Sequence, residues 1–279
     1  MLERPKKIPL PLDGGGLGRG CLILASAMRE GRGRALPALT GLAVLAVLLG
    51  LWQAAVALGF VSPLVAPAPS AIAASFPTLI SDEGLFQRFL QTFTEALISA
   101  GLAVIVGTAI GWWLHAKRWA GLAFESWVGS FAAAPLVLLY PLFLVFFGRN
   151  IGTIVVMSFL TALPSIILKT KEGLDAIRRV LIDVGRSLRL TPTQLFWKIM
   201  LPAAVPTLCT GIRLGLVYAL ISVVGIEFLI NFGGLGELID DLAQRWEIPM
   251  MYGAISFVVL ASICFFYLTE RLERWLRHV

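Results

Sequence analysis

Six apolar segments, each long enough or nearly long enough to cross a lipid bilayer, constrain this chain more than any other feature of its sequence. They cover approximately residues 37–60, 93–115, 128–147, 151–168, 204–230 and 250–268. A membrane-spanning helix needs about 20 mainly apolar residues. Apolar residues make up 58% of the 279-residue chain, and its mean hydropathy is +0.85, far above that of a soluble domain. The chain is therefore expected to be an integral membrane protein.

The spanning segments are expected to be helices. In lipid every backbone N–H and C=O group must be paired within the protein, which an open sheet cannot achieve. The sequence also lacks the repeated ten-residue segments of alternating polarity that are typical of membrane barrels. We therefore predict an all-α membrane protein with six transmembrane helices. The third and fourth segments are short and contain proline, so their limits are the least sharply defined.

The distribution of basic residues predicts the orientation of these helices. Lys and Arg are concentrated at both ends of the chain and in the connections after the second and fourth segments, whereas the other connections contain only Arg88, Arg149 and Arg245. The positive-inside rule then places both termini in the cytoplasm. The net charge of +6 is explained by this topology and requires no nucleic-acid partner.

Two regions differ in composition. Residues 1–35 combine proline, glycine and scattered arginine without apolar periodicity, and are expected to form a flexible cytoplasmic tail. Met28 begins a basic leader to the first segment and is an alternative start to Met1. Residues 36–279 are expected to form the six-helix transmembrane domain, with a polar cytoplasmic loop at about 172–202.

This polar loop has the pattern of two helices joined by a tight turn. Its first half has apolar residues at helical spacing, which predicts a helix from Glu172 to Leu188. The apolar positions are Leu174, Ile177, Leu181, Val184 and Leu188. A second helix is predicted to start after Thr191, which can cap it, with Pro192 in the first helical position and Gln194 completing a capping box. The turn between the helices is expected to be exposed.

The same loop resembles the cytoplasmic "EAA" loop of permease subunits of bacterial ABC importers. That loop has Glu-Ala-Ala, three residues, Gly, nine residues, Ile, one residue and Leu-Pro. Residues 183–185 (Asp-Val-Gly) stand in place of Glu-Ala-Ala, Arg189 stands at the glycine position, and Ile199, Leu201 and Pro202 match the end.

Further segments resemble the nitrate, sulfonate and taurine permeases within that group. Residues 67–71 (Pro-Ala-Pro-Ser-Ala) resemble their external "P-S-P-S" segment, residues 140–148 resemble "W-L-P-L…W-F-G", and residues 233–236 resemble a "G-L-G" turn. The resemblance covers about residues 40–275. It implies the fold of a type I ABC importer permease.

The resemblance also implies a function and a set of partners. The chain would be the permease subunit of an importer in the bacterial inner membrane, carrying a small anionic solute delivered by a periplasmic binding protein. A second permease copy, in a homodimer, would complete the pathway, and two ATPase subunits would hold ATP and Mg. The chain itself would bind no cofactor and would not be an enzyme. The residues implied in coupling to the ATPase are Asp183, Val184, Gly185, Arg186, Arg189, Leu190, Thr191 and Pro192.

Ionisable residues inside the fifth segment are candidates for the translocation pathway, because charges at membrane depth are usually functional. The candidates share one helical face: Arg213, Val217, Leu220, Val224 and Glu227. Arg213 could alternatively extend to the cytoplasmic surface, and Glu227 could be an interfacial residue or make a structural hydrogen bond. Glu95 is expected at the membrane interface. Gly107/Gly111 and Gly211/Gly215 are expected to let helices approach closely.

Other functions are consistent with parts of this pattern. The polar loop could be a basic helix on anionic lipid. A stand-alone secondary transporter would need coupling-ion sites and internal repeats, and an intramembrane enzyme would need a nucleophile with a base or paired carboxylates. An importer for a neutral or cationic vitamin precursor is a further alternative. The sequence contains no Walker A motif, no metal-ligand spacing and no recognisable catalytic set.

Overall fold

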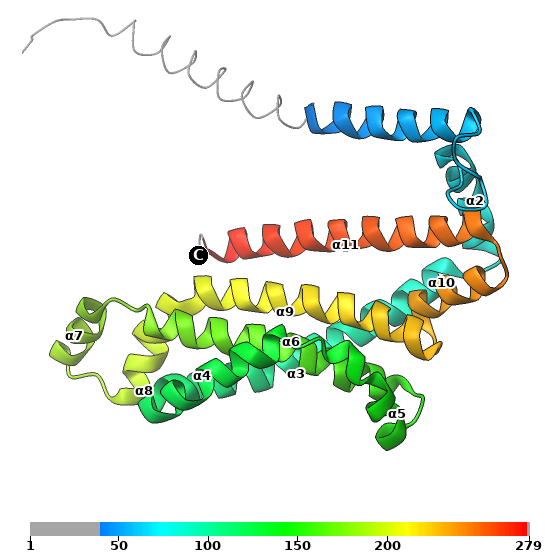
Figure 1. The fold of residues 1–279 in the computed structure, drawn as a ribbon. Helices are drawn as coiled ribbons and strands as arrows, with labels where there is room; N and C mark the ends of the chain where they lie inside the picture. Colours follow the sequence, from blue (N-terminus) through cyan, green and yellow to red (C-terminus); the bar gives the residue numbers. More distant parts are fainter. Residues whose placement is uncertain (1–39, 278–279) are drawn as a thin grey trace, which may run out of the picture. The chain divides into compact units, whose positions relative to one another are not determined.

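The computed structural model describes residues 40–277, and this part of the chain is helical with no strand (Figure 1). The predicted tail and the alternative start at Met28 lie outside the described residues. The chain divides into two parts, and the boundary in the sequence lies between Val61 and Ser62. In the described residues of the first part, the helix Thr40–Ala57 is 18 residues long and has the length and hydropathy of a membrane span.

The second part contains four long helices joined by shorter ones. The long helices are α3 (Leu85–Ala116), α6 (Ile151–Asp175), α9 (Leu201–Ile230) and α11 (Ile248–Arg277). The shorter elements are α2 (Pro69–Ser81), α4 (Arg118–Ala133), η1 (Leu136–Leu139), α5 (Tyr140–Phe147), α7 (Arg179–Ser187), α8 (Pro192–Leu195), η2 (Phe196–Met200) and α10 (Gly234–Gln244).

Five helices in the described residues are long and apolar enough to span a membrane, and the number becomes six if one bent pair counts as a single span. This agrees with the predicted six segments. The cytoplasmic placement of the termini stays a prediction.

The third predicted segment is wrong as a continuous helix over residues 128–147. The chain instead bends by 81° between Arg118–Ala133 and Leu136–Phe147. Pro135 explains the break, because its ring disfavours the helical conformation of the preceding residue. Ala134 accordingly has the extended dihedrals φ −72° and ψ 134°.

Helix α6 is central to the second part and packs along both α3 and α9. Glycines allow this close approach, as predicted for Gly107/Gly111 and Gly211/Gly215. A Cβ atom at Gly111 would lie 2.7 Å from the carbonyl oxygen of Ile167, and one at Gly215 would lie 2.5 Å from Ile166 Cδ1. Both separations are too short for a Cβ, so the helices can approach this closely only because the side chains are absent.

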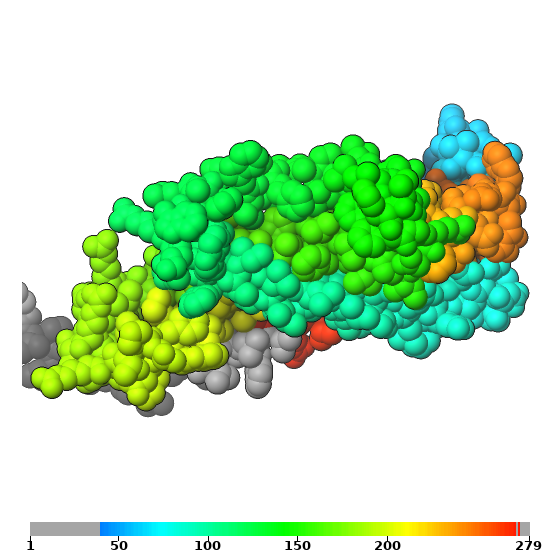
Figure 2. Space-filling view, turned by 90° about the horizontal axis from the view of Figure 1, so that it is seen from below, coloured from blue at the N-terminus to red at the C-terminus, as the bar shows by residue number. Residues whose placement is uncertain are grey.

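The two ends of this bundle carry different structures. Helices α7 and α8 lie at one end, and α10 lies toward the other (Figure 1). The space-filling view shows the region of α7 and α8 protruding beyond the body of the bundle (Figure 2). Helix α10 is held by an apolar cluster shared with α2, α3 and α11, in which Leu79, Leu85, Leu238 and Leu242 are buried.

Two glycines of α3 provide a test of this packing. We expect Gly111→Ala to destabilise the bundle by about 1–3 kcal/mol, the usual effect of overpacking. Gly101→Ala is the matched control, because no atom lies within 4 Å of its added Cβ, and it should be neutral or stabilising by up to about 1 kcal/mol through helix propensity. The measurement is the thermal unfolding midpoint of the purified chain in detergent. Equal shifts for the two variants would contradict the glycine-mediated contact.

Candidate functional site

The predicted coupling residues form a helical elbow, which we define as residues 179–200, between α6 and α9. The prediction of one continuous helix from Glu172 to Leu188 is wrong: α6 ends at Asp175 and α7 begins at Arg179. The reason is tertiary, since Ile177 in the break is buried with Leu174 against the start of α9. The predicted second helix begins at Pro192, as expected.

The turn of the elbow has a left-handed residue at Arg189, with φ 53°. Two hydrogen bonds close the end of α7 around it: the N–H of Arg189 donates to the carbonyl of Arg186 at 2.9 Å, and the N–H of Leu190 donates to that of Gly185 at 3.1 Å. This is the Schellman arrangement, in which glycine normally occupies the left-handed position. Arg189 therefore adopts the glycine conformation although it carries a side chain.

The second helix of the elbow is capped as the sequence predicts. Thr191 Oγ1 accepts a hydrogen bond from the N–H of Gln194 at 3.3 Å, and Gln194 Oε1 accepts one from the N–H of Thr191 at 3.1 Å. This capping box is confirmed. With the Schellman turn directly before it, both helix ends at the elbow have their free backbone groups paired, so the turn has a defined shape.

The inner face of α7 packs on the segment that leads into α9. Leu181 and Ile182 contact a buried cluster that includes Ala204 of α9. Gly185 is buried and so close to Leu195 and Ile199 that a Cβ atom there would overlap both side chains. A displacement of α7 would therefore be transmitted directly to the start of α9.

The outer face of α7 has an apolar row that nothing in the described residues covers. Val180, Val184 and Leu188 are spaced four residues apart and are 69%, 50% and 68% exposed. Exposed arginines surround this row, including Arg186 and Arg189. Val180 was not among the predicted coupling residues, although its spacing from Val184 could have identified it.

The remaining predicted coupling residues have differing exposure. Asp183, Thr191 and Pro192 are exposed, and Asp183 lies 3.8 Å from Arg186. Leu190 is partly buried, and its Cδ1 lies near Gly185. Leu190 was predicted to be exposed at the turn, and this is wrong because the Schellman turn folds it back over α7.

The five predicted pathway residues lie against other helices of the same chain or are partly buried. Arg213 Nη1 is 3.2 Å from Glu273 Oε2 on α11. Leu220 and Val224 line a cavity of about 20 Å³ between α9, α3, α10 and α11. That volume corresponds to about one water molecule. Val217 is half-buried. The cavity beside Leu220 and Val224 is therefore too small for a solute, and the pathway role of the five residues stays a prediction.

Glu227 makes the structural hydrogen bonds that the sequence left as an alternative. Its side chain is fully buried, and its Oε2 accepts from Thr92 Oγ1 at 3.0 Å and from the N–H of Gly236 at 2.9 Å. Glu95, which was expected at the membrane interface, is also buried between helices. These contacts connect α3, α9 and α10.

A polar surface that the sequence reasoning missed lies on the other side of α6 and α9. Thr161, Ser165 and Lys169 of α6 and Tyr218 of α9 line an open pocket of about 350 Å³. We call these four residues the polar face. The signal was present, because the three α6 residues are spaced four apart within an apolar helix. Contact of such polar side chains with lipid is energetically unfavourable, so a face of this kind usually lies inside the protein or borders a water-filled cavity.

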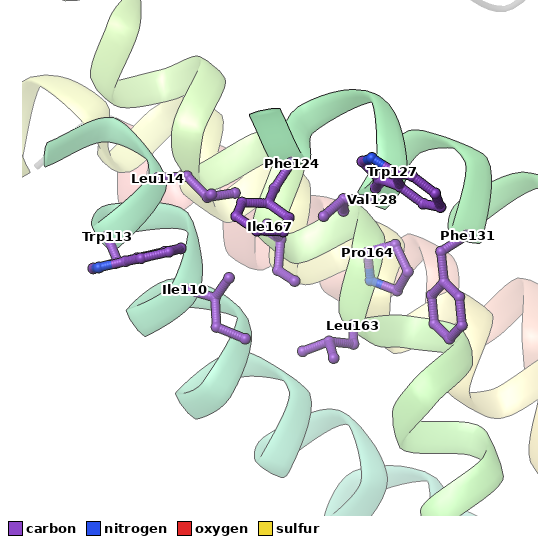
Figure 3. A pocket seen from close by; sticks show the side chains of 10 residues that line it. All are labelled: Ile110, Trp113, Leu114, Phe124, Trp127, Val128, Phe131, Leu163, Pro164 and Ile167. Carbon is purple, nitrogen blue, oxygen red and sulfur yellow. The ribbon is translucent and has the colours of Figure 1, made fainter. Parts of the chain in front are cut away.

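A second large pocket has a different character. It has a volume of about 430 Å³ and an almost wholly apolar lining from α3, α4 and α6. Figure 3 shows its lining side chains, including the rings of Trp113, Phe124, Trp127 and Phe131. With no convergent polar groups, this pocket suits an acyl chain or an apolar side chain rather than a polar solute.

Comparison with known proteins identifies related transporters. The model of the family described as "Binding-protein-dependent transport system inner membrane component" matches residues 103–278. A putative aliphatic sulfonates transport permease of Bacillus subtilis is 30% identical over 243 residues, which cover 84% of this chain and 87% of the relative. A riboflavin transport system permease of Chloroflexus aurantiacus is 30% identical over 240 residues, covering 86% and 90%. The taurine transport system permease of Escherichia coli is 24% identical, covering 83% and 87%.

Solved structures share the fold at lower identity. The inward-facing MetNI methionine ABC transporter has a TM-score of 0.61 at 20% identity, with 69% of this chain and 95% of that chain covered. An amino acid ABC transporter crystallised with histidines has a TM-score of 0.59 at 17% identity, with 71% and 97% covered. The fold is therefore that of type I ABC importer permeases.

Replacing arginine by glycine should have opposite effects on the stability of the elbow at two neighbouring positions. Arg189→Gly should stabilise the turn, because a left-handed conformation costs a residue with a side chain roughly 1–2 kcal/mol and glycine little. Arg186→Gly is the matched control: it removes the same charge from within α7 and should destabilise by about 1 kcal/mol. The rate of amide hydrogen exchange at Leu190, whose N–H closes the turn, reports the stability of the turn in both variants. Slower exchange, by roughly 5- to 30-fold, is expected for Arg189→Gly alone; faster exchange would contradict the assignment.

Proposed function

This chain belongs to the family of binding-protein-dependent inner membrane transport components, and from that premise we propose that its elbow is the surface on which the ATPase docks. The chain is a permease subunit of an ABC importer in the bacterial inner membrane, and it works with an ATPase on a separate subunit and with a substrate-binding protein. This membership sets aside the stand-alone secondary transporter and the intramembrane enzyme.

The observation that carries the docking proposal is the exposed apolar row of Val180, Val184 and Leu188. Burying one such side chain contributes roughly 1.5–3 kcal/mol, which a groove on a partner can supply and water cannot. The arginines beside the row offer charge-assisted hydrogen bonds to acidic groups on that partner. An anionic lipid surface would also accept an apolar row with arginines. The protrusion of α7 and α8 beyond the bundle favours a protein partner (Figure 2).

The packing of α7 supports a role in coupling as well as in docking. Its inner face is fixed to the start of α9 through Gly185, Leu195 and Ile199. Residues Pro192–Ile230 form an uninterrupted helical run of 39 residues. We infer that movement of the docked ATPases displaces this run as a unit. ATP and Mg would be held by the ATPases, and the elbow would lie on the cytoplasmic side, in agreement with the distribution of basic residues.

We further propose that the polar face on α6 and α9 lines the translocation pathway. A second copy of the chain would face it across a two-fold axis, so that the pathway forms between two permeases in a homodimer. Lys169 is the basic residue of this face. Its Nζ lies 2.6 Å from Glu172 Oε2, and its side chain is one-third exposed. A lysine at the mouth of such a pathway favours a small anion, and the related permeases named for aliphatic sulfonates and taurine agree with this class.

A neutral solute is the second candidate for the substrate. The relative named for riboflavin transport is as similar to this chain as the relative named for sulfonates. Thr161, Ser165 and Tyr218 would serve a neutral polar solute through hydrogen bonds without the charge of Lys169. The two candidates therefore differ in whether transport depends on that charge.

The docking proposal predicts the effect of a charge placed in the apolar row. Leu188→Asp should abolish capture of the ATPase and substrate-stimulated ATP hydrolysis, because it removes an apolar contact and puts an anion where acidic partner groups are expected. Leu64→Asp is the matched control, since Leu64 is 72% exposed and lies before α2, outside the elbow. The measurements are ATPase pull-down and ATP hydrolysis in reconstituted vesicles with the binding protein.

Leu188→Asp should leave the spans folded, which its thermal unfolding midpoint in detergent reports. Normal capture and coupled hydrolysis in this variant would remove α7 from the interface. Loss of both activities in Leu64→Asp as well would show that the effect is not specific to the elbow.

The pathway proposal predicts that uptake of an anion depends on the charge at residue 169. Lys169→Gln should lower alkanesulfonate uptake about tenfold or more, the loss of one charge-assisted contact, while Lys169→Arg should retain most of it. Lys117→Gln removes an exposed lysine that follows α3 and is the control. Uptake is measured in the reconstituted importer with its binding protein. Unchanged alkanesulfonate uptake in Lys169→Gln would contradict the role of Lys169, whereas no alkanesulfonate uptake by the wild type would favour the neutral solute.

A further inference from the structure

Two buried carboxyl groups meet at the end of the bundle away from the elbow. Glu95 of α3 is 3% exposed and Glu227 of α9 is fully buried. The two side chains are neighbours, since Glu95 lies one helical turn from Thr92, whose hydroxyl donates to Glu227 Oε2 at 3.0 Å. They lie where α3 and α9 pack on the first turn of α10, so this junction fixes the position of α10.

Glu227 is in a position that suits a carboxylate anion. Its Oε2 accepts hydrogen bonds from Thr92 Oγ1 and from the N–H of Gly236 in the first turn of α10. Thr92 Oγ1 in turn accepts from the N–H of Leu235 at 2.8 Å. The N-terminus of a helix carries a partial positive charge that favours an anion. Gly234 has no Cβ, which allows the carboxylate to approach the helix this closely.

Glu95 has no comparable support for a negative charge. Its Oε1 accepts a hydrogen bond from Gln91 Nε2 at 3.1 Å. Its Oε2 has no hydrogen-bond partner, and neither has Oε1 of the adjacent Glu227. Two anions in contact, buried without a cation, would be strongly unfavourable. A single acidic hydrogen held by the pair would remove this repulsion and would give an unpartnered oxygen a donor.

We propose that Glu95 and Glu227 form a proton-binding site, in which Glu95 is the neutral acid and donates its hydrogen from Oε2 to Oε1 of ionised Glu227. The pair then holds one proton and one negative charge. The negative charge is the one that α10 and Thr92 stabilise. All four carboxyl oxygens of the pair have hydrogen-bond partners in this arrangement.

Charged groups on the surrounding elements are engaged with one another. Arg88 of α3 pairs with Glu237 of α10 at 3.1 Å, and Glu237 also accepts from the N–H of Gly233. Arg245 pairs with Glu83 and with Asp241, and its hydrogen bond lowers the pKa of Asp241. In the described residues, no basic side chain forms an ion pair with Glu95 or Glu227. A proton therefore remains the simplest balancing charge.

The site makes the position of α10 sensitive to hydration of the junction. While the proton is bound, the carboxyl pair connects α3, α9 and α10. If the junction opens to water at neutral pH, Glu95 loses its proton, and re-closure must recover it. The structure thus contains a proton-dependent latch at the end of α9 away from the elbow.

Infrared spectroscopy of the assembled importer in lipid nanodiscs tests the proposal directly, because the carbonyl stretch distinguishes a protonated carboxylic acid from a carboxylate. We expect a protonated-acid band at pH 7 that is absent from Glu95→Gln. Glu237→Gln is the matched control, since Glu237 belongs to the same junction but pairs with Arg88, and it should retain the band. Absence of the band from the wild type, or its persistence in Glu95→Gln, would overturn the proposal.

The pH dependence of stability supplies a second readout. Above about pH 4.3, the ordinary pKa of glutamic acid, the unfolded chain releases a proton that the folded pair retains. Stability of the wild type should therefore fall as pH rises, by up to about tenfold in the unfolding equilibrium constant per pH unit. Glu95→Gln should lack this component, because its neutral amide can donate to Glu227 at any pH, whereas Glu237→Gln should keep it.

Thermal unfolding midpoints are measured between pH 5 and pH 9 for the wild type and for both variants. The difference between the wild-type profile and that of each variant gives the pH-dependent contribution of the substituted residue. Parallel profiles for the wild type and Glu95→Gln would overturn the proposal, as would failure of Glu95→Gln to assemble. Stabilisation of the wild type by Na⁺ over choline at pH 7, absent from Glu95→Gln, would assign the site to a monovalent cation and would also overturn it.

Discussion

The close contact of α6 with α3 and α9 is the interaction on which the rest of the second part depends. It is made possible by glycines at Gly107, Gly111, Gly211 and Gly215, where any Cβ atom would overlap the facing side chains of α6. Because lipid offers little hydrophobic gain for helix association, close van der Waals packing of this kind has to hold the helices together. Once α6 is fixed between its neighbours, its polar residues at 161, 165 and 169 are directed to the remaining open side.

Helix α9 connects the two specialised ends of this bundle. At one end its helical run begins in the elbow, where Phe196–Met200 is a short π-helix. Such segments are uncommon and often occur at functional positions. At the other end α9 carries Glu227, which is hydrogen-bonded to the first turn of α10. A rigid helix between these points would transmit a displacement from one end to the other.

The sequence predicted features that depend on local pattern. The apolar segments, the capping box at Thr191 and Gln194, and the small-residue contacts each follow from spacing along the chain, and each is present. The sequence did not predict features that depend on which neighbour a face meets. Helical periodicity placed Leu220 and Glu227 on one face of α9, but that face packs inside the chain, and the polar face on the other side was missed. The break before α7 was missed for the same reason, because burial of Ile177 overrides the local helical pattern.

Arg189 shows how a departure from a family pattern can leave the geometry unchanged. The residue at this position must adopt φ near 53° for the Schellman bonds of α7 and the capping box of α8 to form next to each other. These paired backbone groups, together with the contact of Gly185 with Leu195 and Ile199, determine the turn more strongly than the single residue at its centre. The cost of a side chain in this conformation, roughly 1–2 kcal/mol, is small beside the several contacts that enforce it. The residue at this position is therefore not restricted to glycine. Arg189 adds a positive charge beside the apolar row of α7, where a docked ATPase would contact that charge.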